Sequence, residues 1–143
     1  MNIEIVEEEK DLQVIIQCRQ VDEQVKRLRS HIELFDNKIQ AKMENEICFV
    51  KSAEVLYFES VDNRIFLYTE DNVMEIKQRL YELEVILSNK DFIRISKSQI
   101  VNVNKIRTLK PEMNRTMLLT MCNGERLCVS RKYVKAFRDL LSI

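Results

Sequence analysis

The sequence predicts a mainly β fold of the α+β class, and three observations support that prediction. Short runs rich in Ile, Val, Phe and Tyr alternate with polar breaks, a hairpin signal surrounds the one glycine, and three stretches follow the helical period of apolar residues. With 143 residues, the chain fits one domain, or one domain with an extension.

The first 38 residues are expected to form a strand pair and a helix ahead of the main domain. Apolar residues alternate with polar ones over residues 3–5 and 12–16, which is typical of half-buried strands. The apolar spacing then changes to four and three residues, with Asp22 as a candidate cap, and predicts an amphipathic helix that ends near Phe35. The apolar face of this helix would dock on the sheet or pair with a partner helix.

Four short strands are expected next, in a meander whose polar breaks include VDNR and EDN. They cover residues 38–43, 47–51, 55–59 and 65–69. A second helix is predicted over residues 74–88, because apolar side chains recur there at helical spacing. Its apolar face would consist of Ile76, Leu80, Leu83 and Leu87.

The clearest local signal is a hairpin centred on Asn123 and Gly124, since these residue types accept the positive φ angles of a type I′ turn. A two-residue loop would pair Cys122 with Glu125, Thr120 with Leu127, Leu119 with Cys128 and Leu118 with Val129. In that register the two cysteines of the hairpin are not cross-strand partners, which argues against a disulfide. A third helix is predicted to start at Arg131, with Ser130 as its N-cap.

Composition disfavours catalytic and metal-binding classes. A single glycine is too few for a phosphate-cradling P-loop or a dinucleotide-binding turn. Four cysteines without a CxxC spacing and one histidine disfavour a zinc site, so we expect no cofactor. No apolar run reaches the length of a membrane span and the first residues lack a secretory pattern, so a soluble, cytoplasmic protein is expected.

The charges are unevenly distributed although they sum to zero. Residues 1–46 carry seven Lys or Arg against eleven Asp or Glu, residues 47–90 carry five against eight, and residues 91–143 carry eleven against four. The last third is therefore +7, which indicates a polyanionic partner, because local charge sets the field that phosphates meet. Chance clustering on a solvated face is the alternative interpretation.

Two basic clusters in this third are candidate phosphate-binding sites. In the first, Arg131 and Lys132 lie in the first turn of the predicted third helix, where the helix dipole disfavours each cation by about 0.3–1 kcal/mol. An anion held by backbone N–H groups, the Ser130 hydroxyl and both cations would offset that cost. Side chains that simply reach into water are the alternative.

The second basic cluster, Ser96, Lys97 and Ser98, follows the strand that residues 92–95 are expected to form. Serine hydroxyls suit phosphates, and lysine suits either a phosphate or the edge of a guanine. The cluster therefore suits a nucleic-acid groove, although an ordinary polar loop has the same composition.

Four separate segments, taken in order, give the chain a resemblance to a known family. They are YFES, LYELE, FIRISKSQIVNVNKI and NGERLCVSRKYV, spread over residues 40–143. Together they resemble the LytTR-type DNA-binding domain of bacterial transcriptional regulators. The resemblance implies an elongated fold of stacked antiparallel β-sheets with few helices over residues 39–143. Loops of this fold would enter successive major grooves of double-stranded DNA at paired direct repeats.

The resemblance also carries site residues onto this chain. The F-x-R-x-H-R-S segment of the family falls on Phe92, Arg94, Ser96, Lys97 and Ser98, and its later S-R falls on Ser130 and Arg131. A third contact loop falls on residues 61–64, where we expect Asn63 or Arg64 to contact DNA. The chain departs from the family pattern in three places: Ser96 replaces a histidine, Lys97 replaces an arginine whose fork lysine cannot form, and the third loop lacks the usual glycine.

The sequence therefore predicts a sequence-specific regulator of transcription that binds duplex DNA and is not an enzyme. Lys97, Arg131 and the loop at residues 63–64 would read bases. The phosphate anchors would be Arg94, Ser96, Ser98, Ser130 and Lys132. Residues 1–38 would mediate homodimerisation, at least on DNA, or partner binding, since a receiver domain of about 120 residues does not fit. The alternatives are a non-catalytic protein-interaction module, a ligand-responsive scaffold, or an RNA-binding domain, for which the basic third offers few aromatic residues.

Overall fold

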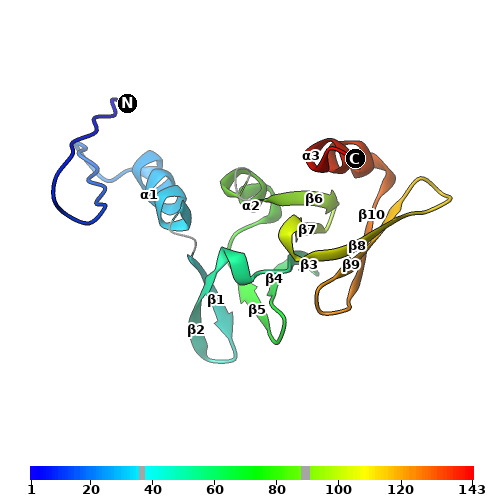
Figure 1. Cartoon of the computed structure of the whole chain (residues 1–143). Coiled ribbons are helices and arrows are strands. Elements are labelled where there is room, and N and C mark those ends of the chain that lie inside the picture. Colours follow the sequence, from blue (N-terminus) through cyan, green and yellow to red (C-terminus); the bar gives the residue numbers. More distant parts are fainter. Residues whose placement is uncertain (36–37, 88–90) are drawn as a thin grey trace.

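The computed structural model describes residues 1–35, 38–87 and 91–143, and the protein is elongated (Figure 1). Helix α1 and the N-terminal segment form one end, a three-stranded sheet forms the other, and a seven-stranded sheet lies between them. Neighbouring strands in both sheets are antiparallel. The predicted mainly β class, with antiparallel sheets and flanking helices, is confirmed.

Ten strands and three α-helices make up the regular structure of the described residues. The strands are β1 (Lys38–Met43), β2 (Glu46–Lys51), β3 (Tyr57–Val61), β4 (Arg64–Tyr68), β5 (Val73–Ile76), β6 (Phe92–Ser96), β7 (Gln99–Asn102), β8 (Ile106–Pro111), β9 (Met117–Met121) and β10 (Arg126–Val129). The helices are α1 (Glu23–Phe35), α2 (Leu80–Ile86) and α3 (Arg131–Leu141), with 3₁₀ turns at Ser52–Glu54 and Val103–Lys105. The four strands predicted for the meander correspond to β1, β2, β3 and β4, each within two residues of its observed bounds.

The central sheet has the strand order β2-β1-β5-β4-β3-β7-β6, and the small sheet has the order β10-β9-β8. Side chains alternate across the inner strand β3, so that Phe58 lies in one hydrophobic core and Tyr57 in the other. The central sheet is therefore covered on both faces. Helix α2 contributes to the first core, and α3 and the small sheet contribute to the second.

Both cores are built from side chains at the spacing that each element dictates. Leu80, Leu83 and Leu87 recur along α2 at helical intervals, and all three are buried against the first core. On α3, the fully buried Phe137 packs into the second core, and burial of each such side chain contributes about 1.5–3 kcal/mol. This packing holds α3 against β6 and so fixes the position of its first turn.

The strand pair predicted near the N-terminus is wrong. Residues 1–22, all of which the structure describes, contain no helix or strand. Ile3, Ile5 and Leu12 are 81%, 88% and 87% exposed. An alternating pattern forms a strand only where a neighbouring strand satisfies its backbone and covers its apolar face, and here no such neighbour exists in the described chain.

The first predicted helix is confirmed as α1. Its start is capped by Asp22, whose carboxylate accepts a hydrogen bond from the Val25 N–H at 3.0 Å. On the predicted apolar face, Val25, Leu28 and Ile32 are half-buried. The expected contribution of the Phe35 side chain to this face lies outside the described residues.

The second predicted helix, over residues 74–88, is wrong in its first part. Met74 and Ile76 belong to β5, where both are buried on the same face of the sheet. Their two-residue spacing is that of a strand, and the helical spacing begins only at Leu80. The expected end of this helix at Ser88 lies outside the described residues.

The hairpin of β9 and β10 is present, but its predicted register is wrong by one residue. The observed pairs are Thr120 with Arg126, Leu119 with Leu127, Leu118 with Cys128 and Met117 with Val129. The loop has three residues, because the Gly124 N–H donates to the Met121 carbonyl at 2.9 Å. Within this loop only Gly124 has a positive φ, of 88°, whereas a two-residue type I′ turn needs two such residues. This register places Leu119 and Leu127 on the same buried face, whereas the predicted one would pair Leu119 with the exposed Cys128.

Three further features concern the described residues as a whole. No helix there is both long enough and apolar enough to cross a membrane. The four cysteines are free. Groups of three or more His, Cys, Asp or Glu side chains that could hold a metal ion do not occur in this part of the chain.

Candidate nucleic-acid interface

The three predicted contact segments are the β3–β4 turn, the β6–β7 turn and the first turn of α3, and main-chain hydrogen bonds join them. The Ser60 N–H donates to the Ser98 carbonyl at 2.8 Å, which links the end of β3 to the β6–β7 turn. The Ser130 N–H donates to the Ile95 carbonyl at 2.9 Å, which links the start of α3 to the end of β6. The fold therefore brings these distant parts of the sequence together.

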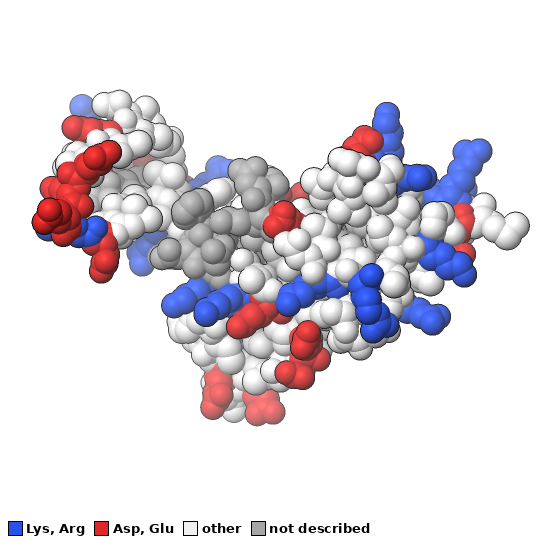
Figure 2. Space-filling view, in the orientation of Figure 1, with Lys and Arg blue, Asp and Glu red and all other residues white. Residues whose placement is uncertain are grey.

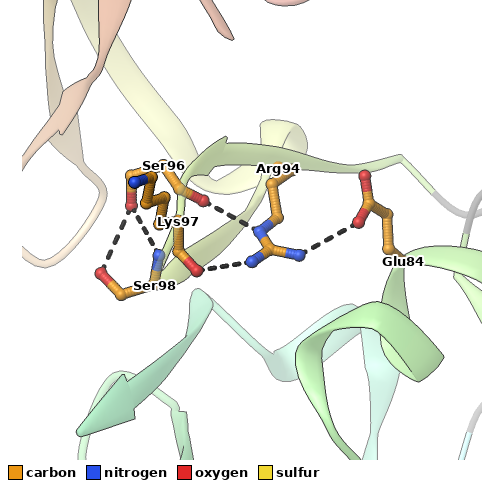
Figure 3. A network of polar contacts seen from close by, with 5 residues as sticks. All are labelled: Glu84, Arg94, Ser96, Lys97 and Ser98. Atoms are coloured by element: carbon orange, nitrogen blue, oxygen red, sulfur yellow. Dashed lines mark hydrogen bonds and ion pairs between the residues drawn. The ribbon is translucent and has the colours of Figure 1, made fainter. Parts of the chain in front are cut away.

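Arg94, expected to anchor a phosphate, is engaged inside the protein (Figure 3). Its guanidinium donates to the carbonyl of Ser96 at 2.9 Å and also to the carbonyl of Lys97. It forms an ion pair with Glu84 of α2 at 3.1 Å, and only 18% of the Arg94 side chain is exposed. Arg94 therefore braces the β6–β7 turn against α2.

The remaining side chains of the β6–β7 turn leave one cation accessible. The Ser96 hydroxyl accepts a hydrogen bond from the Ser98 N–H at 3.2 Å, which stabilises the turn locally. Lys97 is exposed, and in Figure 3 its side chain points away from Arg94. Among the described residues, no carboxylate forms an ion pair with Lys97, so its ammonium is accessible to a phosphate or a base.

A polar network centred on Glu59 supports the same turn from the sheet. The Glu59 carboxylate accepts hydrogen bonds from the Gln99 amide at 2.6 Å and from the Tyr68 hydroxyl at 3.2 Å. Tyr68 stacks on Tyr57 with ring centroids 4.2 Å apart, and burial raises the pKa of both phenols, with nearby carboxylates adding to the effect. Sequence analysis missed this network, because no local pattern connects Glu59 with Gln99, forty residues away.

The β3–β4 turn adopts a strained backbone without any glycine. Asp62 and Asn63 both have positive φ angles, of 50° and 63°, as a two-residue type I′ turn requires. Aspartate and asparagine tolerate this region better than other residues with side chains. Arg79 donates to the Asn63 carbonyl at 2.6 Å and holds the turn, while the Asn63 side chain is exposed.

Arg64, the other candidate in this turn, already has a carboxylate partner. Two nitrogens of its guanidinium bind the two oxygens of Glu75, at 3.0 and 2.7 Å, in a bidentate pair. The hydrogen bonds from Arg64 lower the pKa of Glu75, so the pair is ionised at neutral pH. Arg64 would have to leave Glu75 in order to contact DNA.

The first turn of α3 confirms the predicted helix start but gives Ser130 an unexpected bond. Ser130 occupies the N-cap position, yet its hydroxyl donates to the Ile95 carbonyl at 3.3 Å and does not cap the helix. Arg131 and Lys132 are exposed, and the Lys132 ammonium lies 5.7 Å from the centre of the Tyr133 ring. Within the described ranges, Arg131 has no ion-pair partner, so its guanidinium is accessible.

The charges separate along the length of the molecule, as the sequence predicts. Figure 2 shows acidic side chains gathered on the N-terminal segment at one end and Lys and Arg gathered around α3 and the small sheet at the other. Of the predicted site, Asn63, Lys97, Ser98, Arg131 and Lys132 are exposed, and Ser96 and Ser130 are half-buried. Arg64 is exposed but paired with Glu75, and Arg94 is half-buried and paired with Glu84. A basic surface with hydrogen-bonding turns can bind phosphates and base edges.

Comparison with known proteins agrees with this geometry. The profile of the LytTr DNA-binding domain matches residues 45–142. A solved LytTr DNA-binding domain from Bacillus cereus superimposes with a TM-score of 0.72 and 36% identity, and the match covers 75% of this chain and 98% of that one.

Two curated relatives extend the comparison. An uncharacterized HTH-type transcriptional regulator of Staphylococcus aureus is 34% identical over 101 residues, which is 71% of this chain and 68% of the relative. The sensory transduction protein LytT of Bacillus subtilis is 26% identical over 137 residues, which is 96% of this chain, and the chain spans 57% of that protein's length. The chain belongs to the LytTR family of DNA-binding domains.

Proposed function

We propose that the protein is a transcriptional regulator that binds duplex DNA in a sequence-specific manner and catalyses no reaction. The observation that supports this most directly is the hydrogen bond between Ser130 and Ile95, which joins the start of α3 to the end of β6. The exposed Lys97 and Arg131 follow shortly after this bonded pair, and we call the surface formed by the β6–β7 turn and the first turn of α3 the contact edge. This edge lies in the third of the chain that carries eleven Lys or Arg against four Asp or Glu. The protein would act in the cytoplasm, on promoter DNA.

In this proposal, the exposed side chains divide into base-reading and phosphate-binding groups. Lys97, Arg131 and Asn63 would enter major grooves, because each is exposed and has hydrogen-bond donors that suit base edges. Ser96, Ser98 and Lys132 would contact phosphates on either side, whereas both donors of Ser130, expected to bind a phosphate, already bind the Ile95 carbonyl. Arg94 and Arg64 would act mainly by holding the turns in shape, since both already bind carboxylates.

A selection experiment tests the proposal. The full chain is mixed with a pool of duplexes randomised over about 30 base pairs, bound DNA is recovered through several rounds, and the enriched sequences are footprinted. We expect enrichment of a motif repeated in the same orientation, with the repeats about one or two helical turns apart, since contact loops of two copies would lie on one side of the duplex. A pool that binds but shows no enrichment would reduce the function to non-specific binding, and no binding at low salt would favour a protein-interaction module.

We further propose that residues 1–38 mediate homodimerisation. The support is the exposed apolar surface of the N-terminal segment, where Ile3, Ile5 and Leu12 are each more than 80% exposed. An exposed apolar surface marks a protein-interaction site where its side chains form a contiguous patch. Light scattering of the full chain, alone and on DNA, should give a dimer, and replacing these three residues with serine should return it to a monomer. A wild-type chain that stays monomeric on DNA at high micromolar concentration would exclude this role.

A further inference from the structure

A groove of about 450 Å³ beside α3 gathers cations that the contact edge does not account for. It is lined by Arg115, Arg131, Lys135, Arg138 and Asp139, together with two apolar side chains. Only Arg131 among these was predicted to bind DNA. The groove therefore adds three basic residues, from two separate elements, to the basic end of the molecule.

The helical period explains why the α3 cations line one groove. Arg131, Lys135 and Arg138 are spaced by four and three residues and so lie on one face, while Phe137 points into the core. Arg115 comes from the β8–β9 turn, so its place beside α3 depends on the tertiary fold.

The charges around the groove are unbalanced. Four basic side chains face one acidic side chain, and none of these five forms an ion pair with another residue in the described part of the chain. Like charges held close together repel, so the arrangement is unfavourable in the free protein and is relieved by a bound anion. An extended anion fits better than a small one, because the groove is open and its cations are spread along the helix.

We propose that this groove binds the sugar-phosphate backbone of DNA that flanks the segment contacted by Lys97, an inference that rests on the proposed function. Arg131 belongs to both surfaces, and the Ser130 to Ile95 hydrogen bond makes them continuous. From Arg131 to Arg138 the helix rises about 10 Å, at 1.5 Å per residue. Each DNA strand carries a phosphate about every 3.4 Å along the duplex axis, and because the strand winds around that axis, successive phosphates lie farther apart than this rise. The track therefore contacts two or three successive phosphates.

The test compares two double variants that remove the same charge from different parts of the molecule, the groove and the β1–β2 edge of the central sheet. Arg115→Asn with Arg138→Gln removes a cation from each side of the groove, and asparagine keeps the positive φ of 66° at position 115. Lys42→Gln with Lys51→Gln removes two exposed cations from the β1–β2 hairpin, at the edge of the central sheet opposite to β6. Fluorescence anisotropy with a labelled mixed-sequence duplex of about 30 base pairs, measured over a range of salt concentrations, gives the affinity and the salt slope.

We expect the groove variant to weaken binding about tenfold or more at 0.1 M salt and to reduce the salt slope by about one to two units, since each lost phosphate contact removes about 0.9. The control variant should remain close to wild type. Asp139→Asn should tighten binding about two- to fivefold, a gain that a folding defect would not produce.

The outcomes separate this inference from the proposed function. If the wild type binds and Arg131→Ala weakens it, but the groove variant behaves like the control and Asp139→Asn has no effect, the groove proposal is overturned and the proposed function stands. If the wild type binds no duplex at low salt, both are overturned.

Discussion

Two pairs of cations that look alike in the sequence are used differently in the fold. Arg64 is the first residue of β4 and Arg94 lies inside β6, and each forms an ion pair with a carboxylate of a neighbouring element. Lys97 and Arg131 lie where a strand has ended or a helix begins, and both are exposed without a partner in the described chain. The comparison shows that a carboxylate on a neighbouring element, more than the charge of the basic residue itself, decides whether that residue is held within the protein or is available to a ligand.

Removal of Arg94 should have the largest effect and would test the structural half of the comparison. Arg94→Ala loses hydrogen bonds to two carbonyls and an ion pair with Glu84, so the free energy of unfolding should fall by about 2 kcal/mol. DNA binding should fall as well, because the turn that presents Lys97 loses its brace. Urea denaturation and anisotropy measure the two quantities, and Glu84→Gln is the matched variant on the partner side. Unchanged stability with lost binding would mean that Arg94 contacts DNA itself.

Removal of Lys97 or Arg131 tests the other half. Lys97→Ala and Arg131→Ala should each cost about 1–3 kcal/mol of binding to a selected duplex, and less on a mixed-sequence duplex, if these residues read bases. The free energy of unfolding should change by less than about 0.5 kcal/mol, because both side chains are exposed. Titration of each variant with both duplexes checks this expectation. Equal losses on the two duplexes would assign both residues to phosphates.

A smaller effect is expected for Lys132, which is exposed but lies near the Tyr133 ring. Lys132→Ala should weaken binding to all duplexes alike and reduce the salt slope by about one unit, as expected for a phosphate contact. Salt titrations on selected and mixed-sequence DNA measure this slope. A loss confined to the selected duplex would make Lys132 a base-reading residue.

The smallest effect should come from Glu75, which holds Arg64. Glu75→Gln frees the guanidinium and removes a negative charge, so non-specific binding should tighten by about twofold. The lowered pKa of Glu75 also gives the sign of a pH effect: the pair stabilises the protein above the ordinary carboxyl pKa, and this contribution is lost as pH falls through the lowered value. Urea midpoints between about pH 7 and pH 3 should therefore fall more steeply for wild type than for Glu75→Gln. Parallel pH profiles would show that the pair contributes nothing measurable.

Much of the fold could be predicted from the sequence, because it depends on local patterns. The strands of the meander, α1 and the start of α3 each follow from periodicity and capping residues. The errors arose where two patterns met or where a partner was required. Met74 and Ile76 have the spacing of a strand but are followed closely by the apolar residues of a helix. The hairpin register depends on which face of the hairpin is buried, and residues 1–22 have no strand to pair with in the described chain.

The sequence could indicate the candidate site residues, but it could not indicate which of their side chains are bound to other residues of the protein. The identities of Lys97, Arg131 and Asn63 follow from the family resemblance, and their exposure agrees with the expected role. That Arg94 reaches Glu84, or that Arg115 reaches the groove beside α3, depends on contacts between distant segments. Such contacts leave no periodic signal in a single sequence.

The bond between Ser130 and Ile95 joins main-chain atoms, so it is indifferent to the side chains that follow on either strand or helix. Under the proposed function, exchange of Lys97 or Arg131 for other residues would alter which nucleotides are preferred and would leave the spacing between these two positions unchanged. Divergent members of the family that keep this hydrogen bond would thus acquire new target sequences while the distance between the two positions stays the same.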